Sequence, residues 1–235
     1  MHPPTVTTGW PEFELERLDG LLLRADLHEQ RFLAAGEYGN LVNHLMRCAS
    51  AACLSDREAD GVAFVARAAV RTGEWVRAAR EGRARPSSFA DYALARGWLA
   101  VSIAPTPVAL DILPGFLAMT GWQPAGAVHN ARMVAGLLAG DDAAVDAASQ
   151  KCDLSDAGLG APLKRFALAC VASDRAGMQK ALATWLREKL DATMTHEWGA
   201  YNELPIEVSG ALALAERRGT PLPLASNRVL TRFRA

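Results

Sequence analysis

Apolar residues recur at intervals of three and four positions along almost the whole chain, and strict alternation of apolar and polar residues is nearly absent. A period near 3.6 places such residues on one face of a helix, whereas a half-buried strand needs a period of two. Half of the residues are hydrophobic and 22% are charged, which is an ordinary balance for a globular protein. The sequence therefore predicts an all-α protein.

Glycine, proline and capping residues divide this pattern into helices. Gly36 and Gly39 are predicted to end an early helix, and a helix through Trp75 is predicted to end before Gly82. Asp91, with Ser88 before it, is expected to mark the next helix start. Further helices are expected over 125–139, 141–151, 162–173, 175–191 and 205–218.

The length bounds the domain organisation. At 235 residues the chain exceeds the usual size of one domain, yet helical arrays of this size commonly hold together without an internal linker. Residues 1–235 are therefore predicted to form a single all-helical domain, with a subdivision near 120–125 left open.

One segment, Leu99–Met119, is apolar enough to suggest a membrane span, but it contains Asp111 and the prolines at 105, 107 and 114. An Asp at mid-span costs roughly 2.5–3.5 kcal/mol, and prolines interrupt the continuous helix that lipid requires. Two buried helices and no membrane association are expected instead. The four cysteines form no CxxC pair and the N-terminus has no signal-peptide pattern, which predicts buried thiols and a cytoplasmic location.

A weak internal repeat gives the second half its expected architecture. Leu138-Ala139-Gly140-Asp141 recurs as Val171-Ala172-Ser173-Asp174, and Val145 is matched by Met178. Each copy is typical of a helix, a tight turn and a second helix, in which the small residue ends the first helix and the Asp caps the next. The sequence thus predicts stacked antiparallel helical hairpins, arranged like tetratricopeptide repeats or as an irregular α-solenoid or bundle.

The sequence contains no GxSxG, Walker or GxGxxG motif. His196-Glu197 begins like a zinc-protease helix, but Ala200 stands where the second histidine is required. His28 and His44 could meet across the first two helices, although scattered histidines are more often surface or core residues than ligands. Cys48 or Cys152 would be a nucleophile only if a histidine approached it in space. We therefore expect no enzyme activity, no cofactor and no metal.

Charge is nearly balanced overall, at −1, but varies locally. One stretch of the sequence contains Trp75 and arginines at 67, 71, 77, 80, 83 and 85, a combination that could engage RNA. Glutamates are interspersed among these arginines, which favours solvated helix faces instead. No nucleic-acid partner is therefore expected. A second charged stretch is acidic, with aspartates at 141, 142, 146, 153 and 156. It is either another solvated helix face or a docking patch, for which the candidate residues are Asp141, Asp142 and Asp146.

A second candidate surface lies between the last two expected helices. Trp198 and Tyr201 stand there beside Glu197, and aromatic anchors with polar neighbours are typical of protein interfaces. The alternative is that both aromatic rings fill the junction beneath the two helices.

The order of these motifs is similar to that of a known family. Its helix, Gly-Asp turn and helix are matched by Leu137–Ala144, its second turn by Leu168–Leu182, and its closing helix and tail by Leu204–Gly219 and Pro223–Leu230. The segment from about 128 to 230 resembles the bacterial immunity protein 49 family and, more distantly, other all-helical immunity proteins of polymorphic toxin systems. No residue role carries over, because toxin-facing residues in that family vary with the toxin.

The resemblance implies an immunity protein that binds a cognate toxin in the cytoplasm and neutralises it by direct contact. One alternative is a helical-repeat scaffold or regulator that binds a host-cell protein or peptide in a concave groove. A third is an enzyme whose site is assembled only in three dimensions. The oligomeric state stays open.

Overall fold

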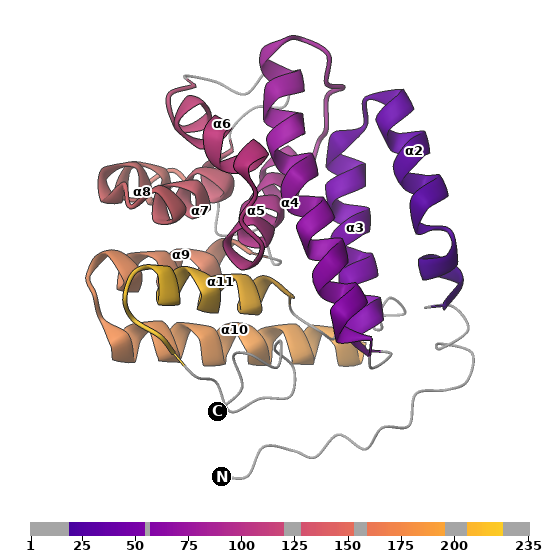
Figure 1. Ribbon diagram of the computed structural model, residues 1–235. Coiled ribbons are helices and arrows are strands. Elements are labelled where there is room, and N and C mark those ends of the chain that lie inside the picture. The colour runs from indigo at the N-terminus through magenta and orange to yellow at the C-terminus, as the bar shows by residue number, and fades with distance from the viewer. Residues whose placement is uncertain (1–18, 55–56, 120–127, 153–158, 196–205, 223–235) are drawn as a thin grey trace.

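The computed structural model describes residues 19–54, 57–119, 128–152, 159–195 and 206–222 (Figure 1). Every regular element in these residues is a helix, which confirms the all-α prediction. The helices pack in contacting, hairpin-like pairs. Their bounds are α2 Ala25–Ala35, α3 Tyr38–Leu54, α4 Glu58–Arg80, α5 Ala90–Ile103, α6 Pro107–Leu117, α7 His129–Ala139, α8 Asp142–Ser149, α9 Gly160–Val171, α10 Arg175–Thr195 and α11 Ile206–Arg217.

Of the two glycines that were predicted to end a helix, Gly36 does so and Gly39 does not. Gly36 has a φ of 68° and ends α2 in the left-handed conformation, which glycine adopts without steric cost. Gly39 instead lies in the first turn of α3, so the prediction that it ends a helix was wrong. A Cβ atom at Gly39 would lie 2.8 Å from Ser87 Oγ and 3.2 Å from the Trp75 ring. Gly39 therefore permits close packing.

The apolar segment after Leu99 lies in two helices, as predicted, but the expectation that both are buried was wrong for α6, where only Ala109, Leu113 and Phe116 are buried. α5 ends at Ile103 and α6 begins at Pro107, where the Thr106 side chain accepts a hydrogen bond from Ala109 N. Pro114 was expected to interrupt the chain but lies inside α6. Only one helical hydrogen bond is lost there, and the carbonyl of Pro114 still accepts from Ala118 N at 3.0 Å. Among the helices described, none is both long and apolar enough to cross a membrane.

α5 and α11 are the most completely buried of the described helices. Every residue of α11 from Ile206 to Ala215 is buried, and α5 is buried from Ala93 to Ile103, as expected for helices that are surrounded by protein. The two helices can approach closely because Gly210 has no side chain: a Cβ atom there would lie only 2.7 Å from Leu99 Cβ. The Ser102 hydroxyl donates to the Gly210 carbonyl at 2.7 Å. Residues of both halves of the chain thus share one hydrophobic core.

A buried ion pair joins the same two helices. Arg96 Nε lies 2.6 Å from a Glu207 carboxylate oxygen, and both side chains are about 5% exposed. Arg96 also donates to the Asn43 side chain on α3 and lies over the Tyr92 ring, 5.4 Å from its centre. Burying this charge is costly unless each partner is satisfied, so the pair fixes how α11 sits on α5 and α3.

Asp91 was predicted to mark a helix start, and it lies in the first turn of α5. Its carboxylate, however, binds backbone amides of another helix. It accepts from Asn130 N at 3.1 Å and Ala131 N at 2.8 Å. These amides belong to the first turn of α7, where Val128 provides no side-chain cap. A carboxylate from α5 thus satisfies the start of α7, although burial raises the pKa of Asp91.

The two copies of the repeat have the same backbone geometry. Gly140 has a φ of 72° and Ser173 a φ of 53°. The next amide in each copy, that of Asp141 or Asp174, donates to a carbonyl five residues earlier, at 2.9 Å. Asp141 then accepts from Ala144 N and Asp174 from Gly177 N, both at 2.9 Å. The predicted helix–turn–helix pairs are therefore α7–α8 and α9–α10.

Candidate partner-binding surfaces

Three helix-ending turns meet at one end of the molecule. α7, α9 and α11 end on the same side (Figure 1), at turns in which Gly140, Ser173 and Gly219 all have positive φ. A pocket of about 310 Å³ lies between these turns. We call this region the three-turn face; its pocket is lined by Gly140, Cys170, Ser173, Met178, Arg217, Arg218 and Thr220.

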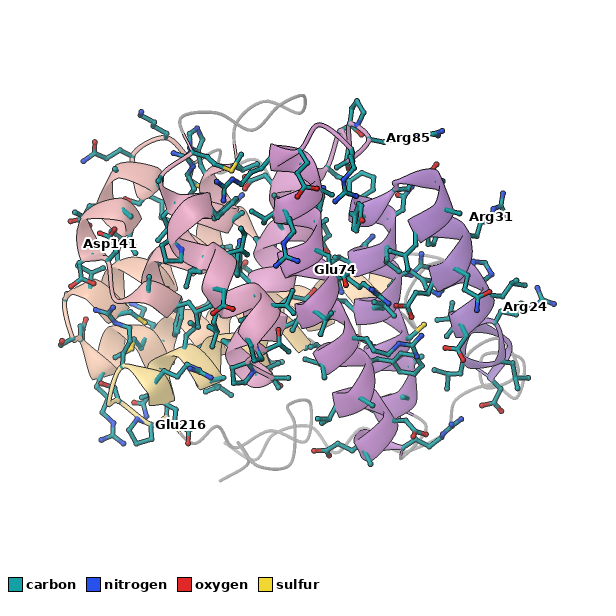
Figure 2. All side chains as sticks on the ribbon, turned by 45° about the horizontal axis from the view of Figure 1, so that its top comes forward. Arg24, Arg31, Glu74, Arg85, Asp141 and Glu216 are labelled. Atoms are coloured by element: carbon teal, nitrogen blue, oxygen red, sulfur yellow. The ribbon has the colours of Figure 1, made fainter. Side chains whose placement is uncertain are left out.

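Two of the predicted acidic residues adjoin residues of this pocket, since Asp141 follows Gly140 and Asp142 pairs with Arg218. Asp141 is exposed and its carboxylate is held by the capping hydrogen bond to α8 (Figure 2). Asp142 is half-exposed and accepts a hydrogen bond from Arg218 at 2.6 Å. Asp146 is exposed on α8. Two of these carboxylates are thus exposed and the third is paired with an arginine, and both a docking patch and a solvated face stay predictions.

The three-turn face is of mixed charge. Asp174 caps α10 as Asp141 caps α8, and Glu216 lies at the same end of the molecule as Asp141 (Figure 2). Arg217 and Arg218 follow from α11, where cations complement the negative end of the helix dipole. A face of mixed charge complements a surface that carries both signs better than one that carries positive charge alone.

Glu197, Trp198 and Tyr201 lie outside the described residues, as does the His196 motif. Both hypotheses for this segment, an interface and a filled junction, stay predictions.

Sequence reasoning missed a groove at the opposite end of the molecule. A pocket of about 500 Å³ separates the short helix of residues 19–23 from the first half of α4. Its apolar walls include Leu22, Leu23 and Phe64, and Leu23 is 86% exposed. Leu27, one turn further along, is 66% exposed. Exposed leucines beside a pocket that also has charged walls are a feature of protein-binding sites.

The signal for this groove was present in the sequence. Residues 21 to 23 are all leucine, and consecutive helical residues point in different directions, so one of the three must leave the core. Charged groups also line the groove, where Arg57 pairs with Asp60 at 2.7 Å. We call this region the leucine groove.

Most of the arginines that suggested nucleic-acid binding are engaged within the protein. Arg67 pairs with Asp26 and Glu29, and Arg71 with Glu29 and Glu74. Arg83 pairs with Glu81, and Arg85 lies 3.6 Å from Glu37. Their positive charge is therefore partly offset by neighbouring carboxylates, and the expectation that this stretch binds no nucleic acid stays a prediction.

The structure does bring a histidine to Cys48. His28 and His44 stack with ring centres 5.0 Å apart, and His44 Nε2 lies 3.6 Å from Cys48 Sγ. Burial raises the pKa of Cys48 to about 12 and lowers the pKa of His44 to about 4. Both groups are neutral at pH 7, whereas a nucleophilic cysteine needs a thiolate. Cys152, the other candidate, donates instead to Asn130 Oδ1 at 3.0 Å.

Metal binding gains no support from these side chains. Within the residues that the structure describes, no group of three or more His, Cys, Asp or Glu side chains is placed to hold a metal ion. The described cysteines are free thiols, three of them buried and Cys53 half-buried.

Comparison with known proteins gives no further assignment. No family model matches the chain, and no curated protein or solved structure is significantly similar to it.

Proposed function

We propose that this protein is an immunity protein that binds a cognate toxin and neutralises it by direct contact. The proposal is carried by the three-turn face, where capping hydrogen bonds hold exposed carboxylates at fixed positions around a pocket. Groups that are already ordered lose little conformational entropy on binding, so more of the interaction energy appears as affinity. The resemblance of residues 128–230 to immunity proteins supports the same function.

Charge complementarity suggests the kind of toxin surface that the three-turn face would bind. Asp141 and Asp146 are exposed, and a basic toxin surface would be attracted to them over a distance of about one Debye length, near 8 Å at physiological salt. Such attraction speeds association, which favours capture of a toxin before it acts.

Co-expression tests the function itself. The toxin encoded beside the gene would be produced with and without this protein, with growth and co-purification as readouts. Rescue of growth together with a stable complex is expected. Rescue without a complex would contradict direct neutralisation, and absence of both would contradict the proposal.

Charge-neutral variants test the face. Asp141→Asn retains a capping oxygen, since Asn and Asp cap helices about equally well, so it removes charge without loosening α8. Asp141→Asn combined with Asp146→Asn is expected to slow association roughly threefold to tenfold at low salt. Asp111→Asn, an exposed position on α6, is the matched control. Unchanged association rates would remove the three-turn face from consideration while leaving the complex intact.

The leucine groove offers a second surface for the same toxin. Leu23→Ser alters a side chain that is 86% exposed, so folding should be little affected, and Leu110→Ser on α6 is a control at 38% exposure. Faster dissociation of the toxin from Leu23→Ser but not from Leu110→Ser would place the contact in the groove.

A further inference from the structure

α2 is attached to the rest of the protein by few apolar contacts. Of its 11 residues only Ala25 and Glu29 are buried, and Phe32 and Leu33 are partly buried against the core. A fully buried Leu or Phe contributes about 1.5–3 kcal/mol, and α2 has none. Figure 1 shows the helix at the edge of the molecule, against α3. Its attachment therefore depends strongly on polar groups.

The first polar contact is a buried carboxylate. Glu29 is only 7% exposed and accepts from Arg67 Nε at 2.9 Å and Arg71 Nε at 2.7 Å. Asp26 accepts from Arg67 Nη2 at 2.6 Å, and Arg71 Nη1 also donates to Glu74. Both arginines belong to α4, so these ion pairs hold α2 across α3 to the next helix.

The second contact is a group of three rings. His28 and Phe32 of α2 lie on His44 of α3, with ring centres 5.0 Å and 5.9 Å from that of His44. His44 is 8% exposed. Cys48 is one helical turn further along the same face of α3 and is fully buried. The rings of α2 thus lie over the face of α3 that contains His44 and Cys48.

We propose that α2 is an acid-released latch: proton uptake by His44 and Glu29 detaches it from α3 and α4 while the central core stays folded, and its release exposes Cys48. The closed latch holds His44 in a place where a positive charge is unfavourable and Glu29 in a place where a negative charge is required. Acid changes both groups in the direction that opens the latch.

The charges around His44 favour its neutral form. Burial lowers its pKa to about 4, and His28 on α2, Arg47 on α3 and Arg67 on α4 act in the same direction, whereas Glu29 on α2 opposes them. In the released state His44 would be exposed to water, where the histidine pKa is about 6.5. The closed state then binds fewer protons than the open state, so it loses stability as the pH falls below about 6.5.

These two pKa values set the size of the effect. Relative to pH 7.5, the ratio of open to closed latch should rise about fourfold at pH 6 and about thirtyfold at pH 5. Glu29 adds to this at lower pH. Burial alone would raise its pKa, but the hydrogen bonds and charges of Arg67 and Arg71 outweigh burial and leave the pKa below 4.5. Its contribution is therefore lost only as the pH falls through that lower value.

Hydrogen exchange with peptide resolution measures the latch in the whole protein. Exchange rates at pH 7.5 and pH 5, corrected for the intrinsic effect of pH, should show α2 opening about thirtyfold more at pH 5 while α5 stays protected. Labelling of Cys48 by 4,4′-dithiodipyridine, which reacts in acid, should increase in parallel, with buried Cys170 as the internal control. Equal loss of protection in α2 and α5 would mean global unfolding and would overturn the proposal.

Two variants separate the latch from general acid sensitivity. His44→Phe keeps a ring in the stack but removes the proton site, so the pH response of α2 should fall below about threefold, whereas His129→Phe on α7 should retain the wild-type response. Glu29→Gln should open α2 at least tenfold more at pH 7.5. A wild-type pH response in His44→Phe, or unchanged exchange of α2 in Glu29→Gln, would refute the latch.

Discussion

Replacement of Glu207 by Gln should destabilise the protein substantially, although it exchanges only one carboxylate oxygen for an amide nitrogen. Arg96 would keep its full charge, since arginine does not deprotonate in proteins, and it is 6% exposed. Within the described part of the chain, its remaining polar and aromatic contacts are the Asn43 side chain and the Tyr92 ring, and neither carries a negative charge. The variant therefore leaves a buried cation without its carboxylate.

The structure gives the size of this loss. With about 4 Å between charge centres and an effective dielectric constant of about 20, the attraction is about 4 kcal/mol. Breaking a buried pair by removal of one partner costs about 3–5 kcal/mol. The side-chain amide oxygen that the Glu207→Gln variant retains can still accept a hydrogen bond, so we expect a loss near the lower end of this range, about 3 kcal/mol.

Urea unfolding followed by circular dichroism measures the loss as a shift in midpoint at unchanged slope. Arg96→Gln and the double variant Arg96→Gln with Glu207→Gln complete a double-mutant cycle. Because the double variant contains neither buried charge, its loss should be smaller than the sum of the two single losses by about 2 kcal/mol or more. A loss under about 1 kcal/mol for Glu207→Gln, or additive losses in the cycle, would refute the assigned role of the pair.

Three further predictions concern the helix ends and the core. Ser173→Gly should raise the free energy of unfolding by about 0.5–1 kcal/mol, and Gly140→Ala should lower it by about 1 kcal/mol, because both positions have positive φ. No atom lies within 4 Å of a Cβ at Gly140, so the loss there would come from the backbone alone. Opposite shifts in thermal midpoint check this pair, and shifts of the same sign would contradict it. Asp91→Ala removes the cap of α7 and should cost about 1–2 kcal/mol, with faster hydrogen exchange at the start of α7 as the specific readout and uniform loss of protection as the contrary result. Gly210→Ala should cost about 1–3 kcal/mol, since its Cβ would lie 2.9 Å from the backbone oxygen of Leu99; a denaturation midpoint equal to wild type would show that the helices can separate freely.

The helices and the repeated turns could be predicted because their causes are local. The five helices expected after residue 125 all occur, with boundaries shifted by up to four residues. The turns at Gly140 and Ser173 followed from a small residue before an Asp, which ends one helix and starts the next within a few residues. Gly39 failed the same reasoning because its small size serves a contact with Ser87 and Trp75 from distant parts of the chain.

The contacts between distant residues could not be predicted from the sequence. Nothing local shows that the carboxylate of Asp91 would cap a helix 39 residues later, or that Arg67 would pair with Glu29. The approach of His28 to His44 was expected as one option, but the burial that keeps His44 and Cys48 neutral depends on the packed tertiary structure. The chemical state of these side chains therefore follows from tertiary packing, even where each residue can be singled out in the sequence.

The position of α11 determines the order in which the chain can complete its core during synthesis. The hydrogen bond from Ser102 to Gly210 joins residues 108 positions apart, so the ribosome adds more than a hundred residues after α5 before its partner helix exists. At about 5–20 residues per second this interval lasts several seconds. Throughout it the apolar surface of α5 that α11 will cover has no native partner and is open to non-native contacts.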